Sequence, residues 1–116
     1  MAQADCIFCN IVAGDIPAGV VYQNESVTAF RDLNPQAPTH VLIVPNQHVD
    51  NTEGLEPAHD ASVAAVLRAA REVARLEGVN ASGYRLVVNT GRDANNTVAH
   101  LHVHLLGGRR LDWPPG

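Results

Sequence analysis

The chain has few basic side chains. Eight lysine and arginine residues stand against twelve acidic ones, which gives a formal net charge of −4 at pH 7. The basic residues form no cluster along the sequence. Non-specific binding to nucleic acid needs a basic surface, because most of its affinity comes from contacts with phosphate. The composition therefore argues against a nucleic-acid partner.

Long apolar runs are also missing. No run approaches the roughly 20 residues that a helix needs to cross a bilayer, so we expect no membrane partner. The first residues, Met1–Asp5, show neither the basic start nor the apolar stretch of a secretory signal. Only two cysteines are present, and without an export signal we expect metal ligands or free thiols before a disulfide. These features together predict a cytoplasmic protein.

Repeats, low-complexity segments and linkers are absent too, so we expect residues 1–116 to form a single domain. Apolar residues recur at intervals of three and four over residues 59–77, which predicts an amphipathic helix. A shorter helix is predicted over residues 6–13, and loops over residues 51–57 and 90–97. Strands are predicted at residues 20–23, 27–31, 40–44, 84–89 and 100–106. Strands with few helices and no regular alternation are typical of an α+β domain on an antiparallel sheet.

The most specific pattern is the last of these strands, where His100, His102 and His104 alternate with apolar residues. Successive side chains of a strand point to opposite faces, so the three imidazoles should share one face and the apolar residues should enter the core. Neighbours in the row then stand about 7 Å apart at their backbones. Such a row could hold a metal ion, a phosphoryl group, or both at opposite ends.

A second chemical signal lies near the N-terminus. Cys6 and Cys9 have the two-residue gap that is used in zinc sites. A redox pair is the alternative, but such pairs normally follow a strand and open a helix in a βαβ unit, a context absent here. Two histidines would complete a tetrahedral site, and His48 and His100 are the candidates. The alternative to zinc is a buried, reduced cysteine pair with His100 hydrogen-bonded in the same place.

The histidine run resembles the signature of the histidine triad (HIT) superfamily of nucleotide hydrolases and transferases. Four further stretches are similar to its purine nucleoside phosphoramidase branch, the histidine triad nucleotide-binding proteins. They are residues 32–40, Pro45-x-x-His48, Val88-Asn89-x-Gly91 and the tail 107–116. The resemblance covers nearly the whole chain. It implies a HIT-like sheet of about five antiparallel strands with one long and one short helix. It also implies a homodimer, with its contact expected at the long helix and the C-terminal tail.

The resemblance also implies a metal. Cysteine-containing members, among them bacterial ones, hold zinc through CxxC, a later histidine and the first histidine of the final cluster. Those positions match Cys6, Cys9, His48 and His100. Because four protein ligands leave no open coordination position, the zinc is expected to be structural.

The activity implied by the resemblance is hydrolysis of the bond between a purine nucleoside 5′-monophosphate and an amine. His102 matches the nucleophile that attacks the α-phosphorus and forms a nucleotidyl-histidine. His104 matches the histidine that contacts the phosphate, and His40 matches the upstream histidine behind the triad. Thr97 stands where the family has a serine that protonates the departing amine. The expected partner is a purine nucleotide, a derivative of AMP or GMP.

Further nucleotide contacts are expected around these groups. Asp32 matches the carboxylate that accepts the ribose hydroxyls. Asn89 and the backbone of residues 90–97 are expected to donate to the phosphate. Phe8 and Leu33 are expected to line the site of the base. For any single apolar residue, core packing is the alternative.

The loop before the histidine run departs from the family at Asn95 and Asn96, where relatives carry Gly-Gln. Asparagine tolerates the left-handed backbone conformation better than most residues, so we expect the loop to form and both residues to contact the nucleotide. His59 fits no motif and is expected to be a surface residue.

Two other functions stay open. A diadenosine polyphosphate hydrolase belongs to the other large branch of the superfamily, which tends to carry glutamine in place of Asn89 and lacks the tail found here. The second is a nucleotide-binding interaction protein with a vestigial site. His40, His102 and His104 are all present, which argues against a vestigial site.

Overall fold

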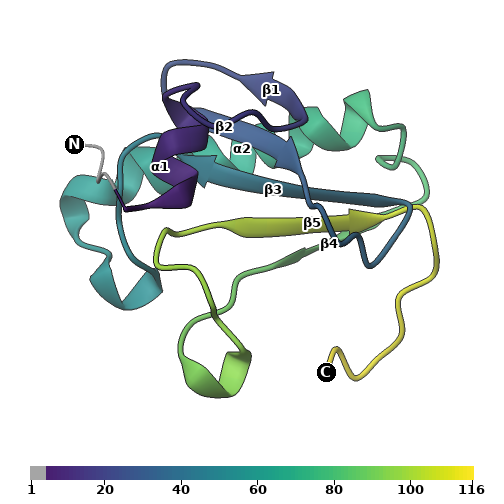
Figure 1. Cartoon of the computed structure of the whole chain (residues 1–116). Coiled ribbons are helices and arrows are strands. Elements are labelled where there is room, and N and C mark those ends of the chain that lie inside the picture. The colour runs from purple at the N-terminus through teal and green to yellow at the C-terminus, as the bar shows by residue number, and fades with distance from the viewer. Residues whose placement is uncertain (1–4) are drawn as a thin grey trace.

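The computed structural model describes residues 5–116. Its five strands form one antiparallel sheet in the order β1-β2-β3-β5-β4 (Figure 1). The strands are β1 (Val20–Gln23), β2 (Val27–Arg31), β3 (Thr39–Pro45), β4 (Tyr84–Val87) and β5 (Val103–Gly107). The helices are α1 (Ile7–Val12) and α2 (Asp60–Leu76), with single 3₁₀ turns η1 (Thr52–Gly54), η2 (Pro57–His59) and η3 (Arg92–Ala94). The predicted α+β class is confirmed. Within residues 5–116 no helix is long and apolar enough to cross a bilayer.

The central strand β3 is buried along its whole length. It lies between the two helices, with α1 over one face of the sheet and α2 over the other (Figure 1). A strand covered on both faces needs apolar side chains in both directions, which explains the continuous run Val41–Val44. Val41 and Ile43 pack in the larger core with α2, whereas Leu42 and Val44 pack in the smaller core with α1.

The long helix α2 supplies much of the larger core. Its buried residues recur at intervals of three and four, as the sequence pattern predicts. At its end, Glu77 forms a two-pronged ion pair with Arg31 of β2, with N–O distances of 2.6 and 3.0 Å. This pair ties the end of the helix to the sheet. The buried residues of α2 are Val66, Ala69, Ala70, Val73 and Ala74.

The last strand begins three residues later than predicted. Its ladder with β3 ends at the pair Ile43 and Val103. Beyond that point β3 reaches Pro45, which has no N–H to donate to a ladder. The Leu101 N–H donates instead to the Val49 carbonyl at 2.7 Å. The segment before β5 is therefore held by contacts other than sheet pairing.

The other elements differ from the prediction by a turn or less. The strand predicted at residues 84–89 ends at Val87, and the loop 90–97 contains the 3₁₀ turn η3. The predicted loop 51–57 contains η1 and the start of η2. Single 3₁₀ turns of three residues leave no periodic apolar pattern, so the sequence gives no signal for them.

Candidate functional site

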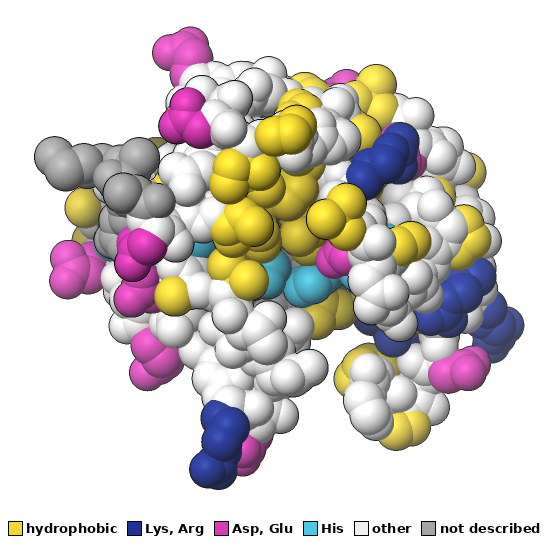
Figure 2. Space-filling model, in the orientation of Figure 1, with side chains coloured by type: hydrophobic (Ala, Val, Ile, Leu, Met, Phe, Trp, Pro, Cys, Tyr) yellow, Lys and Arg dark blue, Asp and Glu magenta, His cyan; other side chains and the backbone are white. Residues whose placement is uncertain are grey.

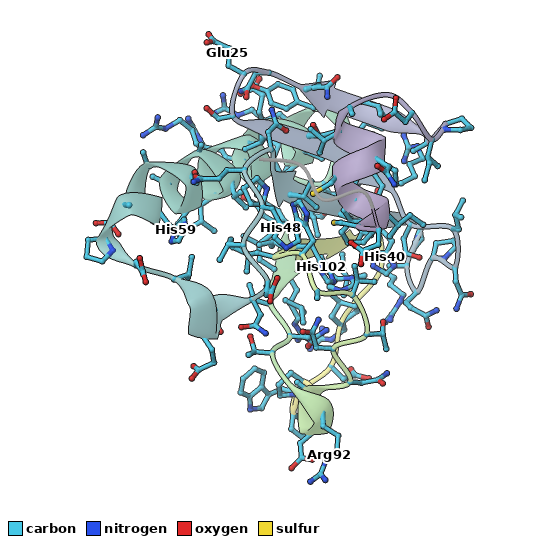
Figure 3. The ribbon with its side chains drawn as sticks, turned by 60° about the vertical axis from the view of Figure 1, so that its left-hand side comes forward. Glu25, His40, His48, His59, Arg92 and His102 are labelled. Atoms are coloured by element: carbon cyan, nitrogen blue, oxygen red, sulfur yellow. The ribbon has the colours of Figure 1, made fainter. Side chains whose placement is uncertain are left out.

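Two groups of side chains lie on the α1 side of the sheet. One is the Cys–His cluster of Cys6, Cys9, His48 and His100. The other is a row of histidines, His40, His102 and His104, beside a cleft. Figure 3 shows His40, His48 and His102 close together below α1, with His59 and Arg92 far from them.

The short helix α1 places both cysteines. Cys6 is its N-cap residue, and its sulfur accepts the Cys9 backbone N–H at 3.2 Å. An N-cap residue and the residue three positions later lie on the same side of a helix start, so the CxxC spacing points both thiols in one direction. Both side chains are buried.

The Cys–His cluster has the dimensions of a tetrahedral metal site. The Cys6 sulfur lies 3.2 Å from His100 Nδ1. The Cys9 sulfur lies 3.3 Å from His48 Nδ1 and 3.5 Å from His100 Nδ1. Zinc bonds of about 2.3 Å to sulfur and about 2.0 Å to nitrogen put tetrahedral S and N ligands about 3.5 Å apart. The four residues named from the sequence therefore meet at separations that fit zinc.

The other ring nitrogen of each histidine in the cluster is also fixed. His48 Nε2 donates to Asp50 Oδ1 at 2.7 Å, and His100 Nε2 donates to the Pro45 carbonyl at 2.9 Å. Because each of these oxygens accepts, both rings carry their proton on Nε2 and keep the Nδ1 lone pair toward the cysteines. Metal-binding histidines are held in this way. Burial also lowers the pKa of His100, which keeps that ring neutral.

His102 is held in the opposite tautomer. Its Nδ1 lies 2.7 Å from the backbone carbonyl oxygen of His100. A carbonyl oxygen only accepts, so Nδ1 carries a proton, and in the neutral ring the lone pair is then on Nε2. The Phe8 ring packs edge-on against the imidazole, with ring centroids 5.2 Å apart and an interplanar angle of 86°. These two contacts fix the orientation of the His102 ring.

His40 and His104 form a short relay beside His102. The Gln36 N–H donates to His40 Nδ1 at 3.0 Å, and His40 Nε2 then donates to His104 Nδ1 at 2.9 Å. His104 must therefore carry its own proton on Nε2. Asp32 Oδ2 lies 3.4 Å from His40 Nε2.

Burial keeps both relay histidines neutral. It lowers the pKa of His40, against the attraction of Asp32. It is also the largest cause that lowers the pKa of His104 to about 4, and the neighbouring His102 and His40 add to the effect. At neutral pH, His104 is therefore an uncharged donor.

A cleft of about 370 Å³, here called the histidine cleft, opens beside this row. Figure 2 shows exposed histidine surface next to a band of apolar side chains. An apolar pocket of about 230 Å³ adjoins the cleft, and Asp32 lines both. The histidine cleft is lined by Asp32, Asn34, Gln36, His40, Asn89, Asn95, Thr97, His102 and His104. The apolar pocket is lined mainly by Ile7, Phe8, Ile11, Ile16, Phe30, Leu33 and Leu42.

Most of the residues proposed from the sequence for the nucleotide site line one of these two spaces, but Asn96 does not. Its side chain donates to the Val98 carbonyl at 3.3 Å within its own loop. Asn95 has φ 59° and ψ 41°, the left-handed conformation expected at this position. Leu33 lines the rim of the apolar pocket but is 99% exposed. Phe8 both lines the pocket and packs in the smaller core.

Two residues that orient histidines of the site, Asp50 and Gln36, gave too little signal in the sequence, and His59 differs in exposure from its prediction. Asp50 holds His48, and its position two residues further along the chain was the only hint. Gln36 acts on His40 through its backbone N–H, which residue type does not reveal. His59, expected to be a surface residue, is half-buried and accepts the Glu56 N–H at 2.9 Å before α2.

The sequence matches the HIT domain over residues 13–111. This chain belongs to the HIT family. A relative, the 14 kDa zinc-binding protein of Zea mays, is 49% identical over 113 residues, which are 95% of this chain and 87% of that protein. The purine nucleoside phosphoramidase of Escherichia coli K12 is 43% identical over 107 residues, 92% of this chain and 90% of that enzyme. The structure of a HIT family hydrolase from Legionella pneumophila aligns with a TM-score of 0.94 at 44% identity. That alignment covers 97% of this chain and 100% of the other, which confirms the HIT-like fold.

Proposed function

We propose that this HIT protein hydrolyses the phosphoramidate bond between a purine nucleoside 5′-monophosphate and an amine. The observation that carries the proposal is the pairing of opposite tautomers in one cleft. In the neutral His102 ring Nε2 carries the lone pair, and His104 offers an Nε2–H beside it, with ring centroids 5.0 Å apart. A nucleophile next to a fixed neutral donor suits attack on a phosphoryl group. The name of the Escherichia coli relative supports this reaction.

In the first step, His102 Nε2 attacks the α-phosphorus, a P–N bond forms to the imidazole, and the bond to the amine breaks. The imidazole becomes positively charged, and its Nδ1–H bond to the His100 carbonyl stabilises that charge. The departing amine takes the electron pair of the broken bond and needs a proton. The Thr97 hydroxyl at the cleft supplies it and regains one from the water that hydrolyses the nucleotidyl-histidine in the second step.

Charge on the phosphoryl oxygens increases in both steps. His104 Nε2–H donates to one of these oxygens, and its low pKa keeps the ring neutral, so it acts as a hydrogen-bond donor without competing for protons. Asn89 and Asn95 line the same cleft and offer side-chain amide donors.

The nucleoside is proposed to lie across Asp32, with its base in the apolar pocket. Asp32 Oδ1 accepts the Asn34 N–H at 2.8 Å, which fixes the carboxylate at the junction of the two spaces. A carboxylate there accepts the two ribose hydroxyls. The rings of Phe8 and Phe30, 5.3 Å apart, form an apolar wall for the base.

We also propose that Cys6, Cys9, His48 and His100 hold a structural zinc ion. Support comes from the ligand separations, the orientation of both histidines, and the name of the Zea mays relative. Zinc with four protein ligands joins α1 to the ends of β3 and β5 and takes no part in the reaction.

A homodimer is proposed as the assembled form. The edge strand β4, Val88 directly after it and Leu67 of α2 expose apolar side chains, and Leu67 and Val88 line one apolar pocket. A second copy of the chain would cover this surface and add buried area to a small domain. The exposed residues are Leu67, Tyr84, Leu86 and Val88. Light scattering across a dilution series measures the mass directly.

The decisive experiment compares kcat/KM for adenosine 5′-phosphoramidate and for a diadenosine polyphosphate, with His102→Ala as the blank. A strong preference for the phosphoramidate supports the proposal. A preference for the dinucleotide would move the protein to the polyphosphate hydrolases. Turnover of neither substrate above the blank would leave a nucleotide-binding protein without this activity.

A further inference from the structure

The tail that follows β5 turns back over the loop between β2 and β3. Gly108 makes this turn with φ +87°, and a Cβ at this position would lie 2.9 Å from the Pro38 Cβ. Such a contact requires glycine, both for the backbone conformation and for the close approach. The turn places the next residue, Arg109, against the loop that carries Gln36.

Arg109 binds that loop at a single backbone carbonyl, that of Gln36. Its Nε and Nη2 both donate to the Gln36 carbonyl oxygen, at 3.1 and 3.0 Å. Its Nη1 donates to the Arg110 carbonyl at 3.0 Å, which orients the guanidinium from the other side. A planar guanidinium with parallel N–H groups defines the direction of its acceptor better than a single donor does.

The residue that Arg109 holds is the same one that orients the histidine relay. The Gln36 N–H donates to His40 Nδ1, His40 Nε2 donates to His104 Nδ1, and His104 then presents Nε2–H to the cleft. The amide and the carbonyl of Gln36 flank one Cα, so fixing the carbonyl restricts where the amide points. An exposed tail residue is thereby connected to a donor in the cleft through four hydrogen bonds, two of them to the Gln36 carbonyl.

We propose that Arg109 is a positioning residue for the phosphoramidase reaction, acting through Gln36 and His40 on the orientation of His104. The proposal rests on the proposed function in that the donor it orients is the one that serves the phosphoryl group. It also gives a role to the Gly-Gly-Arg sequence at the end of β5, in which Gly108 makes the turn and Arg109 binds the Gln36 carbonyl.

A purely structural role for Arg109 predicts something different. The side chain is exposed, and exposed ionic and polar contacts contribute little to stability. If Arg109 were nevertheless structural, its replacement would lower the melting temperature and the activity together. Positioning lowers kcat while the melting temperature and KM change little.

The chain offers a matched control in Arg110. It is also an exposed arginine of the tail, and its side chain makes no hydrogen bond or ion pair within residues 5–116. We expect Arg109→Met to lower kcat for adenosine 5′-phosphoramidate roughly tenfold, the rate equivalent of losing about 1.4 kcal/mol of transition-state stabilisation. Arg110→Met should match the parent. Arg109→Lys keeps one donor and should recover part of the loss, and it serves as the test variant if Arg109→Met does not fold.

A second readout does not depend on turnover. Long-range ¹H–¹⁵N correlation of the histidine rings reports whether His40 Nδ1 accepts a hydrogen bond and which nitrogen of His104 carries the proton. We expect Arg109→Met to shift both sets of signals and Arg110→Met to leave them in place. Ring signals that are identical in the two variants would overturn the proposal, and so would equal kcat values. If the parent protein does not hydrolyse phosphoramidates, the proposed function fails, and the ring signals still decide whether Arg109 positions the relay.

Discussion

The Nδ1–H of His102 donates to the backbone carbonyl of His100 at 2.7 Å. His100 is at the same time a member of the Cys–His cluster, where its own Nδ1 faces Cys6 and Cys9. The ring and the backbone carbonyl of one residue therefore serve the proposed metal site and the proposed nucleophile. Phe8, which lies between the two cysteines in the sequence and packs against both imidazoles, forms a second connection.

Replacing the nucleophile should separate chemistry from binding. We expect His102→Ala to lower kcat by at least about a thousandfold, because no other imidazole in the cleft combines a free Nε2 with this orientation. Affinity for AMP, measured by calorimetry, should stay within a few-fold of the parent, since the ribose and base contacts lie elsewhere. Near-normal turnover by this variant would rule out the covalent route.

Removing a metal ligand should act first on stability. We expect the parent, purified without chelators, to contain close to one equivalent of zinc. Cys9→Ser should lose most of the zinc and at least about 2 kcal/mol of the free energy of unfolding, because metal binding is coupled to folding. Activity should fall as well, through the His100 carbonyl, although zinc takes no part in the reaction.

Elemental analysis and urea unfolding measure the two quantities. Asp50→Asn is the matched milder change, since it leaves all four ligands and weakens only the hydrogen bond to His48. It should lower zinc affinity by roughly 10- to 100-fold. Less than about a tenth of an equivalent in the parent would contradict the metal site.

Loss of the Thr97 hydroxyl should lower kcat more for a poor leaving group than for a good one. Thr97→Val removes the hydroxyl with little change in volume, so we expect kcat for an alkylamine phosphoramidate to fall by about 10²-fold. The loss should be much smaller for an aromatic amine, which departs without full protonation. Thr97→Ser keeps the hydroxyl and should retain activity with both substrates. Equal losses with the two leaving groups would exclude proton transfer by this residue.

The stability of the protein should fall in mild acid because of His104. Its pKa is about 4 in the folded protein and ordinarily 6.5. Between these values the unfolded chain binds more protons, so stability is fully present above pH 6.5 and falls as the pH decreases toward 4. Allowing for partial exposure to solvent, we expect His104 to account for about 1–2 kcal/mol over this window.

His104→Gln isolates this contribution. The variant keeps the Cys–His cluster and His40, so acid release of metal and titration of the other groups affect both proteins alike. Urea unfolding at pH 7, 5.5 and 4.5 should show the parent losing stability faster than the variant. Parallel pH dependence in the two proteins would show that His104 is not buried as a neutral ring.

Local patterns predicted much of this molecule. Residues 20–23 and 27–31 are β1 and β2 as predicted, because alternation and turn residues mark their ends clearly. The two cysteines and two histidines of the cluster were also predicted. The CxxC spacing made the four residues candidates, and the family resemblance strengthened the assignment of His48 and His100.

The remaining features depend on contacts between distant segments or on backbone groups. Gln36 and Arg109 are 73 positions apart and meet only because the tail turns over Pro38. The late start of β5 follows from a proline in its partner strand, not from its own sequence. Neither effect leaves a periodic pattern, so a single sequence could not reveal them.

The double burial of β3 has a consequence for redesigning substrate choice. Leu42 lines the apolar pocket, whereas its neighbours Val41 and Ile43 face the other side of the sheet and the larger core. Successive side chains of β3 thus alternate between lining the apolar pocket and packing in the larger core. A library that varies Leu42 and keeps Val41 and Ile43 would change the shape of the apolar pocket proposed for the base. It would leave unchanged the larger core, in which the sheet packs against α2.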